Sequence, residues 1–444
     1  MNITQEFDTI TAIATPVGTG GIGVIRISGD KSFEITEKIF DKKLVKGQIM
    51  HGKICDGNIL IDEVVVLPFK SPNSYTGEDV VEIQCHGGIN VVQNVLNLVL
   101  KSGARMAERG EYTKRAFLNH KMDLSQAEAV CDLIHAKTSD FAVKSAQNLE
   151  GVLAKEIKEI RHDIFEVMSR IVAGIDFPED MAEPEYSYLE ENFTKSIEKI
   201  DKILKSAKSS NILRQGIKVA IVGRPNVGKS SLFNKLLSLD RAIVTDIAGT
   251  TRDVLTETVD MDGIPVTLID TAGIRDSENV GKVEEIGIEF SKQSADNADL
   301  VLFLYDASTG LTQADNQIFD LIKDKNYIKI ANKCDLIDFE IADSLCVSAI
   351  QESGIENLKS KIKDLILEND SAETEYITNQ RQQNCLLEAK SSLEQALTAT
   401  QIHQLQDLIS IDVKSALLYL DEITGEVVTD EILNNIFDHF CIGK

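Results

Sequence analysis

One eight-residue segment constrains the fold of this chain more than any other. Residues 223–230 read G-R-P-N-V-G-K-S, a complete G-x-x-x-x-G-K-S string, and follow the apolar run 217–222. Between a strand and a helix, the backbone N–H groups of such a loop point at phosphate oxygens. The segment therefore predicts a phosphate-binding loop in a parallel, doubly wound α/β domain. The alternative is a glycine-rich turn before an ordinary helix.

Three further strings follow this loop in a fixed order. D-T-A-G at 270–273 ends the apolar run 266–269, where a carboxylate can hold magnesium through water. N-K-C-D at 332–335 follows a second apolar run, and its carboxylate can accept the two adjacent N–H groups of guanine, a pair that adenine lacks. Ser348-Ala349 would complete the base pocket. Each string alone is weak, but the ordered set predicts binding of GTP rather than ATP.

The polar loop 245–253 lies between the first two motifs and carries threonines that can meet magnesium and the γ-phosphate. We interpret it as a switch loop; the alternative is a plain surface turn. Lys229 adds a point charge at the phosphates, and Ser230 and Thr251 are the expected Mg²⁺ ligands. The predicted GTP contacts are Asn226, Val227, Gly228, Lys229, Ser230, Ser231, Thr245, Asp246, Ile247, Ala248, Gly249, Thr250, Thr251, Asp270, Thr271, Ala272, Gly273, Asn332, Lys333, Asp335, Ser348, Ala349 and Ile350.

The residue that usually positions the hydrolytic water is missing. Ile274 stands after Gly273, where Ras-type enzymes carry a glutamine. No arginine finger can be assigned from the sequence. Arg252 and Arg275 are close to the switch loops in sequence, but each also fits a solvated or salt-bridged side chain. A monovalent cation held by Asn226 and loop carbonyls could neutralise the charge that develops on the phosphates.

The rest of the chain, 444 residues in all, is long enough for two or three domains. Short apolar runs between turns predict a small α+β domain over 1–118. Residues 119–214 and 372–444 repeat apolar positions every three or four residues, as helices do, and flank the α/β segment 215–371. We therefore expect a multidomain chain in which a P-loop domain is inserted into a discontinuous all-α domain.

Two local details of the helical segments are also predicted. Apolar positions from Leu149 to Ile171 indicate one long amphipathic helix, followed by a second helix and a polar, Lys-Ser-rich hinge that ends near Gln215. Helix is expected again from Glu373, with Ile402 and Leu405 at the start of an apolar stripe.

Composition limits the class of protein. A hydrophobic share of 43%, with no signal peptide and no run long enough to span a membrane, predicts a soluble cytoplasmic protein. The seven cysteines form no C-x-x-C pair, which favours a reducing compartment. The formal charge of −25 repels phosphate backbones, so we expect any RNA contact to depend on a partner.

Two strings imitate other motifs. G-T-G-G-I-G at 18–23 fits G-x-G-x-x-G, but it precedes a predicted strand instead of following one, so we interpret it as a turn. Cys441 is fourth from the end, as in a prenylation box, yet Gly443 and Lys444 match that box poorly and no polybasic stretch precedes it.

Strings along the whole chain resemble one family, the MnmE/TrmE tRNA modification GTPases, which are grouped with the potassium-activated TrmE-Era-Der-like GTPases. The matching strings are I-R-I-S-G at 25–29, S-Y-T-G-E-D at 74–79, H-G-G at 86–88, G-E-Y-T at 110–113, R-A-F-L-N at 115–119, the loop 245–253, and the terminal Cys441-Ile442-Gly443-Lys444. One departure is His120, which stands where a glycine is common.

The resemblance implies that the N-terminal domain binds 5-formyl- or 5,10-methylene-tetrahydrofolate and dimerises. The family's folate contacts fall on Arg26, Glu82, Lys121 and Lys444. A pterin has a guanine-like edge that a carboxylate can read, and cationic side chains suit the glutamate carboxylates or ring oxygens of the folate. Without the resemblance, each of these residues would be an ordinary surface or strand-end charge.

The resemblance also implies a potassium site made by Asn226 with Thr245, Ile247 and Thr250. It points to Glu284 as the carboxylate that orients the hydrolytic water, which gives Glu284, Asn226 and Lys229 as the catalytic set; the neighbouring Glu285 leaves the first assignment ambiguous. Cys441 is implied to lie near the folate and the tRNA-modification site, and a structural thiol is the alternative.

The implied function is GTP hydrolysis by a homodimer whose G domains pair in potassium. The flavoprotein MnmG (GidA) would join in a heterotetramer or larger complex and place a carboxymethylaminomethyl-type group on C5 of the wobble uridine, U34, of certain tRNAs. Two rival interpretations are a ribosome-assembly GTPase of the Era/Der type and a nucleotide-dependent scaffold without turnover.

Overall fold

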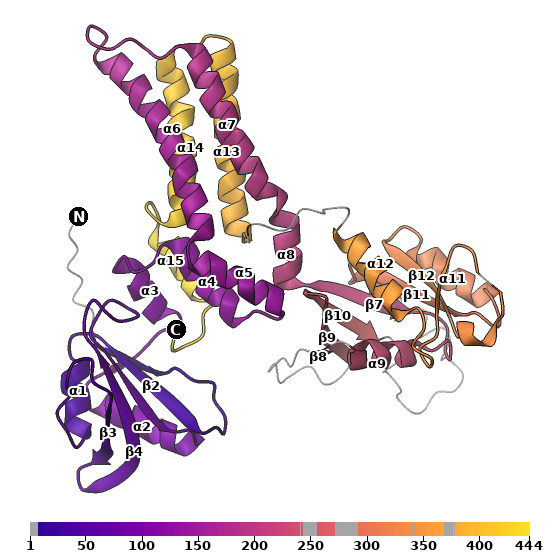
Figure 1. Cartoon of the computed structure of the whole chain (residues 1–444), viewed down its shortest axis with the longest axis horizontal. Coiled ribbons are helices and arrows are strands. Elements are labelled where there is room, and N and C mark those ends of the chain that lie inside the picture. The colour runs from indigo at the N-terminus through magenta and orange to yellow at the C-terminus, as the bar shows by residue number, and fades with distance from the viewer. Residues whose placement is uncertain are drawn as a thin grey trace. The chain divides into compact units, whose positions relative to one another are not determined.

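The computed structural model describes residues 8–239, 241–242, 255–270, 292–339, 341–367, 376 and 378–444. Contacts between residues divide the chain into two compact units. Unit 1 consists of Met1–Cys131, Gln147–Ile197 and Glu388–Lys444, and unit 2 of Asp132–Ala146 and Glu198–Leu387. Each unit thus combines segments that are far apart in sequence, as the colours of Figure 1 show.

Unit 1 contains a six-stranded sheet in the order β3-β4-β5-β2-β1-β6. Its strands are β1 (Ile10–Ile13), β2 (Ile22–Ser28), β3 (Met50–Asp56), β4 (Ile59–Phe69), β5 (Val80–His86) and β6 (Arg105–Met106). Neighbours are antiparallel except β1 and β6, which are parallel. Helices α1 (Ser32–Ile39) and α2 (Ile89–Lys101) pack on one face of the sheet, which confirms the α+β prediction.

Alternation along β2 and β5 explains why only one face is covered by these helices. Ile25, Ile27 and Ile83 are fully buried in one apolar core with side chains of α1 and α2. Arg26 and Glu82, which pair across the two strands, alternate with these residues and lie on the opposite face. Each buried aliphatic side chain contributes about 1.5–3 kcal/mol, so the apolar face fixes the register and leaves the other face for polar groups.

Several helices follow the sheet in sequence. They are α3 (Glu111–Leu118), α4 (Leu124–Ile134), α5 (Ser139–Leu149), α6 (Val152–Asp176), α7 (Tyr186–Lys205), α8 (Ala207–Gln215), α13 (Gln380–Gln401), α14 (Gln406–Thr424) and α15 (Asp430–Phe437). In unit 1, α6 packs along α14, and Arg161 of α6 is paired with Asp421 of α14. Helices before and after the α/β segment therefore form one discontinuous helical domain, as predicted.

Unit 2 contains a seven-stranded sheet in the order β13-β12-β11-β7-β10-β9-β8. Its strands are β7 (Ile217–Val222), β8 (Arg241–Ala242), β9 (Leu255–Met261), β10 (Ile264–Asp270), β11 (Leu300–Asp306), β12 (Tyr327–Asn332) and β13 (Leu345–Val347). Strands β13 to β10 of that order run parallel, whereas β9 and β8 are antiparallel to their neighbours. The carboxyl ends of the parallel strands meet at one edge, where ligands bind in such sheets.

Helices cover both faces of this sheet, as expected for a doubly wound fold. Side chains of α9 (Lys229–Leu239) and α12 (Ile355–Leu367) share a core with Val219, Ile221 and Leu302. On the other face, α11 (Gln313–Ile322) packs on alternate residues of the same strands. A short 3₁₀ turn, Cys334–Leu336, follows β12.

The predicted long helix is confirmed over most of its length, but it does not include Leu149. Leu149 ends α5, and α6 begins at Val152. Between them Gly151 has a φ of 93°, a left-handed conformation that interrupts helical hydrogen bonding and that glycine adopts without strain. Apolar spacing alone cannot detect such a break, because Leu149 and Leu153 keep a helical spacing of four residues across it.

Other predicted boundaries also shift. The Lys-Ser-rich segment expected to be a hinge contains the helix α8, and Ser210 of that helix donates a hydrogen bond to the carbonyl of Tyr376. Helix α13 begins at Gln380, and Glu373, where helix was expected to resume, lies outside the described residues. The stripe residues Ile402 and Leu405 are exposed and lie between α13 and α14. In the part of the chain that is described, no helix is long and apolar enough to cross a membrane.

Candidate functional site

The loop after β7 has the backbone of a phosphate-binding loop. Gly223, Asn226 and Gly228 have φ values of 154°, 66° and 100°. A Cβ atom on Gly228 would lie 2.1 Å from Nδ2 of Asn332, and one on Gly223 would lie 2.2 Å from the carbonyl oxygen of Leu304. Both glycines are therefore required by close approach as well as by backbone conformation.

Lys229 is folded over the same loop. Its Nζ atom donates to the carbonyl oxygens of Gly223 and Arg224 at 2.8 and 2.9 Å. Lys229 and Ser230 open helix α9, and Ser230 is exposed at its N-terminus. Asp270 ends β10 opposite Ile221 of β7, so the backbone brings the predicted magnesium-related carboxylate position to the strand end that carries the loop. Hydroxyl and carboxylate oxygens are suitable magnesium ligands, so these positions fit the ion.

Side chains of the predicted guanine motif donate hydrogen bonds to the phosphate loop. Asn332, which is 2% exposed, donates from Nδ2 to the carbonyl oxygen of Val227 at 2.8 Å. Lys333 donates from Nζ to the carbonyl oxygen of Asn226 at 3.0 Å. Two residues of the base motif thus fix the position of two consecutive peptides of the loop.

The predicted base pocket is formed by the ends of β12 and β13. Asp335 is exposed in the 3₁₀ turn, with its carboxylate accessible to a base. Ser348 is buried, and the backbone N–H of Ala349 donates to Oδ1 of Asn332 at 3.4 Å. Ile350 is 81% exposed. The described residues therefore bring the loop, the base motif and the Ser348-Ala349 pair together at one sheet edge.

Part of the predicted nucleotide and cation set lies outside the described residues. This part comprises Thr245, Asp246, Ile247, Ala248, Gly249, Thr250, Thr251, Thr271, Ala272, Gly273 and Glu284. The predicted roles of these residues in binding Mg²⁺ and K⁺ and in orienting water remain predictions. Among the described residues, no group of three or more His, Cys, Asp and Glu side chains is arranged to hold a metal ion.

Sequence reasoning missed two carboxylates at this site, Asp306 and Asp315. Asp306, at the end of β11, accepts from Nζ of Lys333 at 2.6 Å. Asp315, in the first turn of α11, accepts from Nε of Arg224 at 2.7 Å. The spacing T-x-x-D at 312–315 is a helix-start signal that could have located Asp315, and the structure has a reciprocal capping box there.

A second polar cluster lies on the face of the sheet in unit 1 that α1 and α2 do not cover. Arg26 donates from Nε to Oε1 of Glu82 at 2.8 Å, and its guanidinium lies over the rings of Tyr75 and Tyr112. The Nη1 atom of Arg26 is buried and has no hydrogen-bond partner in the described structure. A buried, unsatisfied donor costs free energy unless a ligand oxygen or water accepts from it.

The C-terminal residues reach the same cluster. Ile442 forms an antiparallel bridge with Arg109, and Gly443 has a φ of 99° where a Cβ atom would lie 2.3 Å from the carbonyl oxygen of Ile13. Burial and the charge of Arg26 lower the pKa of Lys444, and Glu82 partly opposes this shift. Three of the four predicted folate residues, from β2, β5 and the C-terminus, are therefore neighbours.

Lys121 and Cys441 are the two other residues predicted at the folate and modification site. Lys121 donates from Nζ to the carbonyl oxygen of Pro72 at 3.1 Å, beside the loop that carries Tyr75. Cys441 is exposed, and its carbonyl oxygen accepts from Gly110. His120 has a φ of 55°, a conformation that the glycine common at this position would adopt more readily.

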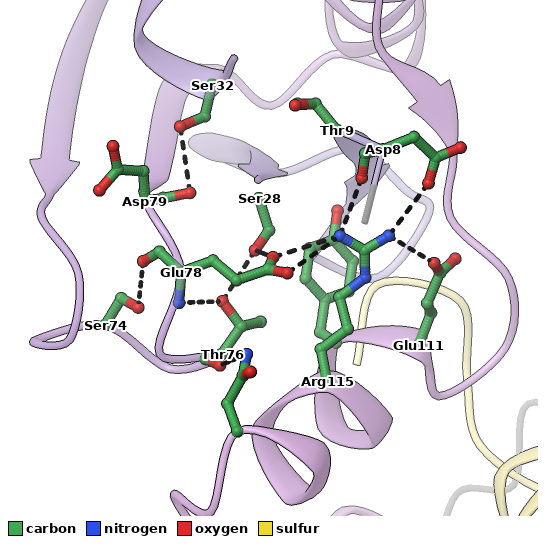
Figure 2. Close-up of polar contacts among 12 residues, drawn as sticks. Asp8, Thr9, Ser28, Ser32, Ser74, Thr76, Glu78, Asp79, Glu111 and Arg115 are labelled. Atoms are coloured by element: carbon green, nitrogen blue, oxygen red, sulfur yellow. Dashed lines mark hydrogen bonds and ion pairs between the residues drawn. The ribbon is translucent and has the colours of Figure 1, made fainter. Parts of the chain in front are cut away.

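An ion-pair cluster supports the loops around this face (Figure 2). Arg115, which is 1% exposed, donates to Glu78 at 3.2 Å, to Glu111 at 2.8 Å, and to Asp8 at 2.9 Å on the backbone and 3.3 Å on the carboxylate. Burial raises the pKa of Glu111, but hydrogen bonds from Arg105, the Glu108 amide and Arg115 outweigh it and leave that pKa lowered. The strings S-Y-T-G-E-D and R-A-F-L-N meet in this cluster, so their side chains stabilise one another.

Two family models match the chain. The model of the MnmE helical domain matches residues 124–441, and the model of the GTP-binding protein TrmE N-terminus matches residues 9–121. Together they account for the α+β domain and for the discontinuous helical domain with the α/β segment inside it.

Similar proteins match over the whole length. A tRNA modification GTPase MnmE of Thermoanaerobacter pseudethanolicus is 46% identical over 460 positions, which cover 99% of this chain and 100% of the relative. The Clostridioides difficile MnmE is 45% identical, with 98% and 99% covered. A solved structure of Era with MgGDPNP and 16S ribosomal RNA is 26% identical, covers 40% of this chain and 66% of that chain, and has a TM-score of 0.28. Because the MnmE relatives match from end to end, this chain belongs to the MnmE family of tRNA modification GTPases.

Proposed function

We propose that this GTPase hydrolyses GTP to drive a folate-dependent modification at C5 of the wobble uridine of certain tRNAs. The product would be a carboxymethylaminomethyl-type group, formed together with the flavoprotein MnmG. The observation that carries this proposal is the proximity of Arg26, Glu82 and Lys444 on the face of the N-terminal sheet that α1 and α2 do not cover. A tetrahydrofolate bound there would supply a one-carbon unit.

The residues of this face fit a folate. Glu82 can accept the adjacent N–H groups of a pterin edge, and the unsatisfied Nη1 donor of Arg26 suits a ring or carboxylate oxygen. Tyr75 and Tyr112 flank the guanidinium and hold it in place, because an aromatic face attracts a cation. Cys441 lies in the same terminal segment as Lys444, and we propose that it lies at the edge of the modification site.

Replacing Glu82 with glutamine is expected to weaken 5-formyl-tetrahydrofolate binding by about 10-fold or more, because the variant loses charged hydrogen bonds to both Arg26 and the pterin. Isothermal titration calorimetry measures the dissociation constant. Glu34→Gln is the matched control, since Glu34 forms an exposed ion pair with Lys38 in the same domain. Equal affinities for the parent and the Glu82 variant would exclude this face as the folate site.

The second part of the proposal concerns hydrolysis. Lys229 and the loop amides would bind the phosphates, Ser230 and Thr251 would hold Mg²⁺, and Asp335 would read guanine. We assign the orientation of the hydrolytic water to Glu284, and a K⁺ site to Asn226 with Thr245, Ile247 and Thr250. Asn226 supports this assignment, because its side chain is exposed at the turn of the loop with a φ of 66°.

Potassium is expected to accelerate GTP hydrolysis about 10-fold or more over sodium at equal ionic strength, because a fitted cation stabilises the charge that develops in the transition state. Phosphate release by the purified full chain measures the rate. Asn226→Ala is expected to remove most of the difference between the salts. Equal rates in both salts would remove the cation from the mechanism, and no turnover in either would favour the scaffold interpretation.

The proposal extends to partners and location, which the family membership supports. The formal charge of −25 disfavours extensive contact of this chain with RNA phosphates, so we propose that tRNA is held mainly by the flavoprotein. We further propose a homodimer formed through the N-terminal domain, and a cytoplasmic location.

A further inference from the structure

The segment 306–315, which joins β11 to α11, contacts the nucleotide site at both ends. At its far end Asp315 is fully buried, and its two carboxylate oxygens have different partners. Oδ1 accepts from Nε of Arg224 at 2.7 Å. Oδ2 accepts from the N–H and Oγ1 of Thr312 at 2.9 and 2.7 Å. The Asp315 carboxylate thus caps the start of α11 and also binds Arg224 of the phosphate loop.

At its near end the segment holds the base motif. Asp306 accepts from Nζ of Lys333 through Oδ2 and from Ser308 through Oδ1. Burial raises the pKa of Asp306, but the hydrogen bonds from Lys333 and Ser308 outweigh it and leave that pKa lowered. The carboxylate is therefore charged at neutral pH and fixes the ammonium that donates to the carbonyl oxygen of Asn226.

We propose that Asp306 and Asp315 are positioning residues for GTP and GDP binding. Asp306 binds Lys333, which donates to the carbonyl oxygen of Asn226. Asp315 binds the side chain of Arg224, a residue whose carbonyl oxygen accepts from Lys229. The inference rests on GTP binding at the loop 223–230 and is independent of the folate and tRNA proposals.

The two roles of Asp315 can be separated because they use different oxygen atoms. Asp315→Asn keeps an acceptor for the helix cap but removes the charge that pairs with Arg224. Thr312→Ala removes the reciprocal cap and leaves the Arg224 pair in place. Asp320→Asn is the matched control, since Asp320 lies on the same helix and forms only an exposed pair with Lys323.

The experiment measures the affinity of the full chain for a fluorescent GDP analogue, with the thermal midpoint of each variant recorded without nucleotide. Asp315→Asn and Asp306→Asn are each expected to bind GDP about 10-fold more weakly. Thr312→Ala and Asp320→Asn are expected to stay within about twofold of the parent. In turnover assays KM should rise more than kcat falls, because the loss is in binding both states.

A double-mutant cycle tests whether Asp315 acts through Arg224. If it does, Arg224→Gln with Asp315→Asn should bind GDP no more weakly than either single variant. A folded Asp315→Asn variant with parental GDP affinity would overturn the proposal, as would strictly additive losses in the cycle. A parent chain that binds no GDP would instead contradict the nucleotide site itself.

Discussion

Gly228→Ala is expected to weaken binding of GTP and GDP by about 100-fold, the largest single effect at the nucleotide site. The new Cβ atom would lie 2.1 Å from Nδ2 of Asn332, which donates a buried hydrogen bond to Val227. The φ of 100° is also costly for alanine. The loop 223–230 would therefore change its conformation in the absence of nucleotide. Part of the free energy of nucleotide binding would then be needed to restore the original conformation.

The control for backbone strain is Gly310→Ala. Gly310 also has a positive φ, of 66°, but a Cβ atom there would meet no atom within 4 Å. Titration with a fluorescent GDP analogue should separate the two variants, with the Gly310 variant within about threefold of the parent. If both variants lost GDP affinity to a similar extent, the strain of a positive φ, and not the contact with Asn332, would explain the loss.

Arg115→Met is expected to destabilise the N-terminal α+β domain by about 3–5 kcal/mol, because it leaves charged carboxylates facing one another in a buried site. The side chains of Glu78 and Glu111 are 10% and 11% exposed, and both form ion pairs with the Arg115 guanidinium (Figure 2). Glu78 also accepts from Ser28 at the end of β2. Hydrogen exchange of the β2 and β5 amides measures the loss within this domain without requiring two-state unfolding of the whole chain.

Arg105→Gln provides the comparison for this prediction. Arg105 also pairs with Asp8 and Glu111, but its side chain is 41% exposed, so the expected loss is about 1 kcal/mol or less. If Arg115→Met changed amide protection no more than Arg105→Gln, the cluster would be a solvated surface network and not a buried support of the domain.

Features that depend on local pattern could be predicted from the sequence. The loop 223–230 needs glycines and a lysine at fixed spacing, and Ile217–Val222 is a strand with the predicted bounds. The alternation of buried residues in β2 and the three-or-four spacing in α6 and α14 follow from the geometry of one strand or helix. The fold class could be predicted because these periods are strong over long segments.

Some local boundaries could not be predicted from the same patterns. Leu149 and Leu153 keep helical spacing across the break at Gly151, so spacing does not reveal it. Helix α8 begins within the Lys-Ser-rich segment, and the hydrogen bond from Ser210 to the carbonyl of Tyr376, 166 positions away, is a tertiary contact that overrides weak local preference.

Which charged side chains pair with one another depends on the folded arrangement of distant segments. Arg115 and Asp8 are separated by 107 positions, and Arg224 and Asp315 by 91. Lys444 joins Arg26 and Glu82 because Gly443 allows the chain end to lie against β1. A charged residue has no periodicity that names its partner, since its free energy depends on burial and on the groups within a few ångströms. That is why the sequence located the phosphate loop but not the two carboxylates that hold it.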